Sequence, residues 1–237
     1  MRGGILAIGS LYWSNHPSRV TWRSTRLSQA YEHSALVPIR YGRKSKCRGN
    51  TYTMVFSLLC LRRSHGLGVA KAIPFRIDIE TTVSLIAEAE LLWAAERKAV
   101  GGEGTLSASW GSVALLTNPN SDIPGPMLEG WAARVASEIH YGRISHARSE
   151  HTVVSRDGHL GIPWPETIQK EPLDLDFLLA TATNPILSGK PPTYPRARDV
   201  ALAWKRDRAG NVDYFWKNRA SGIYTYQDEA IQNYLSK

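Results

Sequence analysis

Short runs of apolar and β-branched residues recur through the first half of the chain and predict β-strands. They cover residues 5–8, 36–41, 51–61, 68–75 and 109–117. Helical spacing of apolar residues predicts helices over 80–98 and 127–141, and glycines after each favour termination. Because strands dominate and do not alternate regularly with helices, the pattern predicts an α+β fold rather than a parallel βαβ sheet.

The character of the sequence changes after Gly142. Residues 143–172 mix charged residues and histidines with turn-forming proline and glycine, and short helices are predicted at about 173–180 and 195–208. An aromatic tail follows. We therefore predict a strand-rich domain over residues 1–142 and a mainly helical C-terminal extension over residues 143–237.

The composition is that of a globular protein, with 43% hydrophobic residues among 237. It is also basic, because 29 Lys and Arg against 21 Asp and Glu give a formal net charge of +8. This composition excludes a disordered chain, and no apolar run reaches the ~18 residues of a membrane span. We expect a soluble, cytoplasmic protein that does not enter a membrane.

Cysteines and histidines show no metal-binding pattern. Cys47 and Cys60 are too few for a four-thiolate site. His140, His146 and His151 lack the i, i+4 spacing of a helical pair of ligands. We therefore expect no bound metal.

Basic residues cluster between Arg40 and Arg48, with Tyr41 and Tyr52 nearby. Basic residues interleaved with aromatic ones are typical of surfaces that bind single-stranded nucleic acid. The same composition occurs in solvated hairpin loops and around pockets that attract small anions. Nucleic acid and a small anionic molecule therefore both stay open as partners.

A Gly9-Ser10 pair directly follows the first predicted strand. Glycine allows a ligand to approach the backbone closely, and successive backbone amides can form an anion-binding nest. Many strands end in such a turn without binding a ligand. By itself, the pair indicates only a candidate anion site.

One arc of the helix predicted over 80–98 is apolar at ~100° per residue. It comprises Val83, Ile86, Ala89 and Trp93. Glu90 lies within this arc, Glu88 falls on the opposite side, and Glu96 leans toward the apolar side near the helix end. A carboxylate on an apolar arc is costly unless it is ion-paired to an arginine or used in proton transfer.

Three segments carry short motifs in a defined order. Ile5–Trp13 is a strand followed by Gly-Ser-Leu-Tyr-Trp, Gly68–Pro74 is a strand that begins Gly-Val, and Val113–Ser121 is a strand that ends in Asn-Pro-Asn. Together they resemble the gamma-glutamylcyclotransferase-like family, and the first motif resembles its glutathione-acting branch. The resemblance covers roughly residues 5–135.

The resemblance implies a small mixed β-barrel with flanking helices in residues 1–142. It also implies an enzyme in which the free α-amine of a gamma-glutamyl amide attacks the γ-carbonyl and 5-oxoproline is released. One glutamate acts as acid and base, and this role falls on Glu90, with Glu88 as the fallback. The residues implied to bind the substrate are Gly9, Ser10, Leu11 and Tyr12. Neither a metal nor an organic cofactor is implied.

The sequence also departs from the family pattern. Ile8 and Ser121 stand where the family usually has tyrosine, and Leu91 follows Glu90 where glycine is usual. A non-catalytic module that binds a small anion on the same fold is therefore an alternative to the enzyme. Nucleic-acid binding through residues 40–48 is a further alternative.

Overall fold

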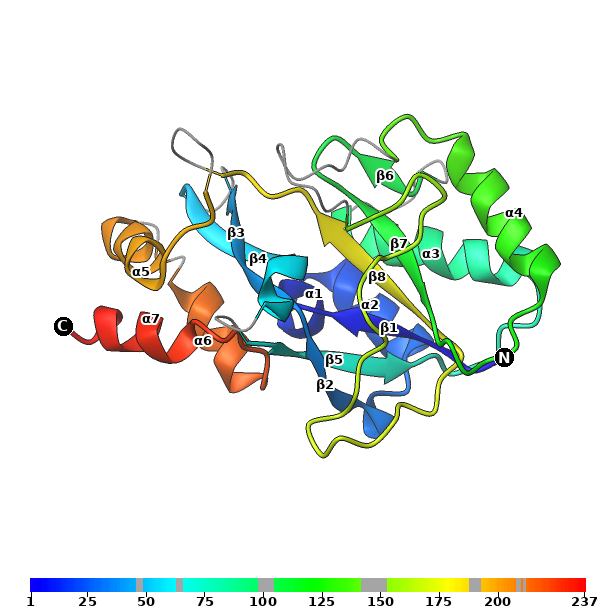
Figure 1. Cartoon of the computed structure of the whole chain (residues 1–237), viewed down its shortest axis with the longest axis horizontal. Helices are drawn as coiled ribbons and strands as arrows, with labels where there is room; N and C mark the ends of the chain where they lie inside the picture. The colour runs from blue at the N-terminus through cyan, green and yellow to red at the C-terminus, as the bar shows by residue number, and fades with distance from the viewer. Residues whose placement is uncertain are drawn as a thin grey trace.

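The computed structural model describes residues 1–45, 49–62, 66–97, 105–141, 153–187, 193–207, 210 and 212–237. Helices and strands are mixed in one fold, with the strands at its centre (Figure 1). Several predicted features lie outside the described residues. They are the glycines expected to end the two helices, Cys47, Arg48, His146 and His151.

A six-stranded mixed sheet forms the centre of the fold. In spatial order its strands are β2 (His33–Val37), β5 (Gly68–Pro74), β1 (Gly3–Ala7), β8 (Phe177–Thr183), β7 (Gly111–Thr117) and β6 (Ser107–Ala108). β1 and β8 run parallel, with Ile5 opposite Leu179, and every other neighbouring pair is antiparallel.

A second, two-stranded sheet consists of β3 (Ile39–Ser45) and β4 (Thr51–Phe56), which pair antiparallel. It lies at one end of the six-stranded sheet (Figure 1). Within the described part of the chain, the two sheets do not close into a barrel, so the barrel implied by the resemblance is not confirmed.

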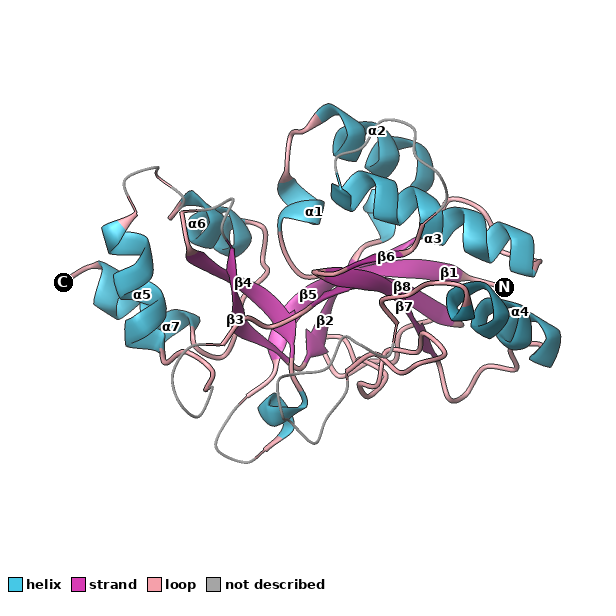
Figure 2. Cartoon of the chain, turned by 90° about the horizontal axis from the view of Figure 1, so that it is seen from above, coloured by secondary structure: helices cyan, strands magenta, loops and turns pink. Residues whose placement is uncertain are grey.

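Helices gather on one face of the sheet and at its two ends (Figure 2). The face is covered by α1 (Ser10–Trp13), α2 (Pro17–Arg26) and α3 (Thr82–Arg97), and α4 (Gly125–Ala136) lies at the end near the N-terminus. The opposite end, around β3 and β4, holds α5 (Ala197–Arg206), α6 (Asp213–Ala220) and α7 (Asp228–Leu235). The short helices η1 (Gln29–Tyr31) and η3 (Leu58–Leu61) are of the 3₁₀ type. No helix in the described ranges is long and apolar enough to cross a membrane.

β8 is the main departure from the predicted elements. The prediction of a helix over 173–180 is wrong, because Phe177–Thr183 is a strand. Six of its seven residues are buried, so both of its faces are apolar and no alternation marks it as a strand. β8 lies between β1 and β7, so residues from both sides of the boundary predicted after 142 share one sheet.

Other boundaries differ where the chain turns. The strand predicted over 36–41 is divided at Pro38 between β2 and β3, and β3 continues through Ser45 into the basic stretch 40–48. The strand predicted over 51–61 ends at Phe56, and η3 follows it. α2 is not predicted at all, although Pro17 at its first turn is a favourable start.

Candidate functional site

A pocket of about 750 Å³ opens where the chain leaves β1. It is surrounded by the β1–α1 segment, the β3–β4 pair, the last turn of α3, β8 and one residue of α6. We call it the Gly9 pocket, and the lining residues that matter most are Gly9, Ser10, Leu11, Arg19, Glu96 and Tyr214. Its volume is in the range of sites that bind small molecules.

The segment between β1 and α1 forms one wall, and α2 holds it in place. The Arg23 guanidinium donates hydrogen bonds to the Leu11 carbonyl at 2.6 Å and to the Ser14 carbonyl at 2.7 Å. Burial lowers the pKa of Arg23, and the nearby charge of Arg19 lowers it further. Two adjacent guanidinium groups beside this segment make its surroundings favourable for an anion.

Arg19 connects this wall to the end of α3. Its side chain is 3% exposed, and its guanidinium donates to Ser10 Oγ at 2.9 Å and to Glu96 Oε2 at 3.2 Å. It also donates to the backbone carbonyls of Ala95 and Glu96, both at 3.1 Å. A single side chain therefore holds the Glu96 carboxylate and the Ser10 hydroxyl on the same side of the pocket.

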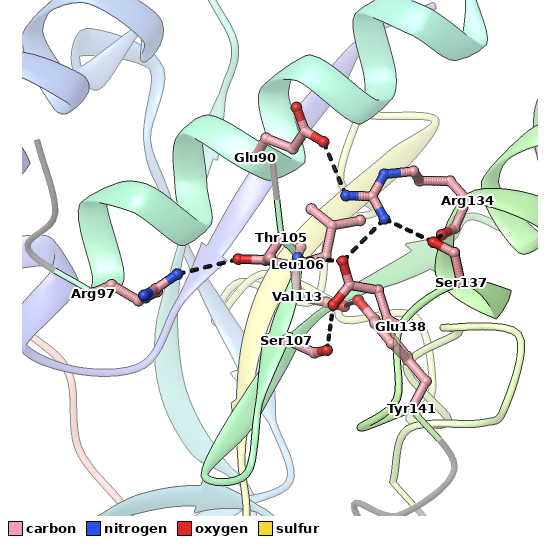
Figure 3. Close-up of polar contacts among 10 residues, drawn as sticks. All are labelled: Glu90, Arg97, Thr105, Leu106, Ser107, Val113, Arg134, Ser137, Glu138 and Tyr141. Carbon is pink, nitrogen blue, oxygen red and sulfur yellow. Dashed lines mark hydrogen bonds and ion pairs between the residues drawn. The ribbon is translucent and has the colours of Figure 1, made fainter. Parts of the chain in front are cut away.

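Glu90 and Glu88, the predicted acid/base and its fallback, do not line the Gly9 pocket. Glu90 turns toward α4 and accepts a hydrogen bond from Arg134 at 3.0 Å (Figure 3). Glu88 is 2% exposed and is ion-paired with Arg26 of α2. The α3 carboxylate that the structure brings to the pocket is instead Glu96.

The Glu90 contact belongs to a network that ties α4 to α3 and β6 (Figure 3). Arg134 also pairs with Glu138 at 3.0 Å, and Glu138 accepts hydrogen bonds from the Leu106 N–H and the Ser107 hydroxyl. Burial acts to raise the pKa of Glu138, but these hydrogen bonds and the Arg134 charge outweigh burial, and the pKa is lowered. Glu90 is therefore part of the contacts that hold α3, α4 and β6 together.

The predicted substrate-binding residues separate into two groups. Gly9, Ser10 and Leu11 line the pocket, whereas Tyr12 does not. The Tyr12 hydroxyl donates to the Glu32 carboxylate at 2.8 Å, and Lys71 pairs with the same carboxylate at 3.0 Å. Burial, together with Glu32, raises the pKa of Tyr12 to about 12.

The basic stretch that begins at Arg40 faces inward at several positions. Arg40 is buried, and its guanidinium lies 4.3 Å from the ring centre of Tyr194. Arg43 and Lys44 line the Gly9 pocket, and Arg43 donates to the Asn184 carbonyl at 2.8 Å. Arg43 and Lys44 therefore contribute their charge to the pocket, and Arg40 lies in the interior.

The charge of the pocket lining is strongly unequal. Four cationic residues line it, Arg19, Arg43, Lys44 and Arg97, against the carboxylate of Glu96 among the described residues. An excess of positive charge in a concave site raises the local concentration of anionic ligands. Among the described residues, no group of three or more His, Cys, Asp or Glu side chains could hold a metal ion.

Sequence reasoning missed the contribution of Arg19 and Tyr214 to this pocket. Arg19 lies in a segment with no predicted element, and only the fold brings it to Ser10 of the β1–α1 segment. Tyr214 comes from the C-terminal part of the chain, and no motif marks it.

Comparison with protein-family models, curated proteins and solved structures finds no match to this chain.

Proposed function

We propose that this protein cleaves gamma-glutamyl amides by internal displacement, with Glu96 as the acid and base. The observation that supports the proposal is that Glu96 shares one pocket with Gly9, Ser10 and Leu11, to which Arg19 connects it. The resemblance implies an acid/base glutamate on the helix after Gly68–Pro74 and gives the role to Glu90. We move the role to Glu96 of the same helix, because Glu96 lines the pocket and Glu90 does not.

The reaction needs one group that moves a proton twice. Glu96 accepts a proton from the α-ammonium group of the substrate, and the amine nitrogen attacks the γ-carbonyl carbon. As the amide C–N bond breaks, Glu96 gives this proton to the leaving nitrogen. The second proton of the attacking nitrogen follows through the same carboxylate, so that 5-oxoproline and a protonated amine are the products. Backbone amides of the Gly9–Leu11 segment supply donors for the developing oxyanion.

The pocket charge fits this class of substrate. The head of a gamma-glutamyl compound carries a free α-carboxylate, and the lining cations Arg19, Arg43 and Lys44 attract such a group. The volume of about 750 Å³ also leaves room for a leaving amine larger than methylamine beside the gamma-glutamyl head.

The first test is a panel of gamma-glutamyl amides assayed for 5-oxoproline, with free glutamate measured in parallel. Internal attack predicts 5-oxoproline and no glutamate. An N-acetylated member of the panel should give no product, because its blocked amine cannot attack. Release of glutamate in place of 5-oxoproline would overturn the mechanism, and no turnover of any member would overturn the function.

The second test compares two glutamates of the same helix. We predict that Glu96→Gln lowers kcat by about 100-fold or more, because the amide cannot accept the ammonium proton. Glu90→Gln is the matched control and should keep kcat within about twofold, since Glu90 does not line the pocket. The melting temperature of each variant is measured as well, because Glu96 pairs with Arg19 and Glu90 with Arg134, and kcat is compared well below the lower of the two. Full activity of Glu96→Gln would contradict its role.

A binding module for a small anion is the second candidate function. The excess of positive charge in the lining favours it. The ion pair between Arg19 and Glu96 favours it as well, because it engages the carboxylate that the enzyme would use as a base. Such a module would bind carboxylate ligands in calorimetric titration and turn over none of the panel.

Nucleic-acid binding through residues 40–48 has less support, because Arg40 is buried. A gel shift at low salt, where phosphate contacts are strongest, tests that alternative directly.

A further inference from the structure

Tyr214 brings the C-terminal part of the chain into contact with the Gly9 pocket. It is the second residue of α6, is 5% exposed, and lines the pocket with Gly9. A β-carbon placed at Gly9 would lie 2.6 Å from the Tyr214 hydroxyl oxygen. Gly9 has an extended backbone with φ 173°, which any residue adopts, so a larger residue there would have to displace the Tyr214 hydroxyl rather than strain the backbone.

Aromatic and polar contacts hold α6 against the wall of the pocket. The Trp13 ring meets the Tyr214 ring edge-on, with 5.9 Å between centroids, and the Trp13 indole N–H donates to Asn218 Oδ1 at 2.6 Å. On the other side of α6, Phe215 packs on Trp204 of α5 at 5.3 Å between centroids. These contacts fix the place of the hydroxyl before a ligand arrives, which is what a binding site needs.

The Tyr214 hydroxyl lies beside the same segment of the pocket wall as Arg19. It lies at Gly9, while Arg19 and Glu96 are held at the next residue, Ser10. Tyr214, Arg19 and Glu96 therefore line the same pocket at neighbouring residues of one segment. A phenol hydroxyl can donate to a carboxylate without adding charge to a lining that is already cationic.

We propose that Tyr214 is a substrate-binding residue of the Gly9 pocket, whose hydroxyl donates a hydrogen bond to a carboxylate of the bound ligand. The identity of that ligand rests on the proposed function, but the binding role of Tyr214 does not. The C-terminal segment then completes a site whose motifs all lie in the first half of the chain.

The test measures binding and turnover separately. 5-Oxoproline is titrated calorimetrically into the wild type, Tyr214→Phe and Tyr234→Phe, and KM and kcat are measured with the best gamma-glutamyl substrate. We predict that Tyr214→Phe weakens 5-oxoproline binding and raises KM, each about tenfold, with kcat and melting temperature near those of the wild type. Tyr234→Phe, a partly exposed tyrosine on α7, should change neither.

A second variant tests the contact between Tyr214 and Gly9. Gly9→Ala places a methyl group in the space of the hydroxyl, so it should also weaken binding. Adding Tyr214→Phe removes that clash, so the double variant should bind no more weakly than Tyr214→Phe alone. If the double variant instead loses affinity for 5-oxoproline by the product of the two single losses, the result counts against the contact.

The two proposals can fail independently. If the wild type binds 5-oxoproline but converts no gamma-glutamyl compound, the enzymatic function fails, and a tenfold loss in Tyr214→Phe still supports the binding role. Equal binding by wild type and Tyr214→Phe, with equal KM, overturns the role of Tyr214 alone. A wild type that binds neither 5-oxoproline nor any substrate overturns both.

Discussion

Asp228, the first residue of α7, has a carboxyl group that is almost completely buried. Its Oδ1 accepts hydrogen bonds from the Thr225 N–H at 2.8 Å and the Thr225 hydroxyl at 2.6 Å. Its Oδ2 lies 4.0 Å from the Arg219 guanidinium. Burial raises the pKa of Asp228 to about 6, and the Thr225 hydrogen bonds and Arg219 offset only part of that rise.

We predict that Asp228→Asn stabilises the protein at pH 8 and changes its stability little at pH 4. The raised pKa in the fold means that the protonated carboxyl is favoured there. Its contribution to stability is present below pH ~4 and is lost as the pH rises through about 6. Asparagine keeps the acceptor for Thr225, and the gain at pH 8 is up to about 3 kcal/mol.

Melting temperatures of wild type and variant at pH 4 and pH 8 check this prediction. Asp213→Asn is the control, since the Asp213 side chain is 69% exposed and its variant should follow the wild type. A variant that melts below the wild type at pH 8 would show that the Asp228 charge is stabilised in the fold.

At the scale of elements, α3 shows how one helix serves several neighbours. Three of its acidic residues face different partners: Glu88 faces α2, Glu90 faces α4, and Glu96 faces the Gly9 pocket. A helix packed on several sides has no single apolar arc. Of the predicted arc, Ala89 and Trp93 are buried, but Val83 is 77% exposed. Leu85 and Leu92, which lie outside that arc, are buried as well.

We predict that Arg26→Met destabilises the protein by about 3 kcal/mol, because it leaves the buried Glu88 carboxylate without its ionic partner. Glu90→Gln, which removes a partly exposed ion pair on the same helix, should cost less than ~1 kcal/mol. Urea unfolding measures both. Adding Glu88→Leu to Arg26→Met should recover much of the loss, and equal small effects of Arg26→Met and Glu90→Gln would contradict the prediction.

The elements that the sequence predicted correctly are those with a clear local signal. β1, β5 and β7 are short apolar runs bounded by turn residues, and α3 has helical spacing over sixteen residues. β8 lacks a local signal, because its strand character comes from its neighbours in the sheet. For the site, the turn at Gly9 was predictable from its glycine and serine. That Glu96 rather than Glu90 lines the pocket depends on where α3 lies relative to β1 and β8, which sequence spacing does not give.

At the scale of the whole molecule, the two halves of the chain depend on each other. We predict that a fragment of residues 1–142 does not fold cooperatively, because β1 and β7 lose β8 between them. The fragment also lacks Tyr214 and Thr181 of the pocket lining. Circular dichroism through a urea titration, with the full chain as control, measures this. A sigmoidal transition in the fragment would show that residues 1–142 form an independent domain.

The parallel pairing of β1 with β8 can form only late in synthesis, because the two strands are far apart in the sequence. The Arg2 N–H donates to the Asp176 carboxylate at 2.7 Å, across a separation of 174 residues. At ~5–20 residues per second, a ribosome takes roughly 10–35 seconds to add the intervening chain. During that interval the edge of β1 that later pairs with β8 is unpaired. An unpaired strand edge can pair with a strand of another nascent chain. The topology therefore leaves one edge of β1 open to pairing with another chain until β8 has been synthesised.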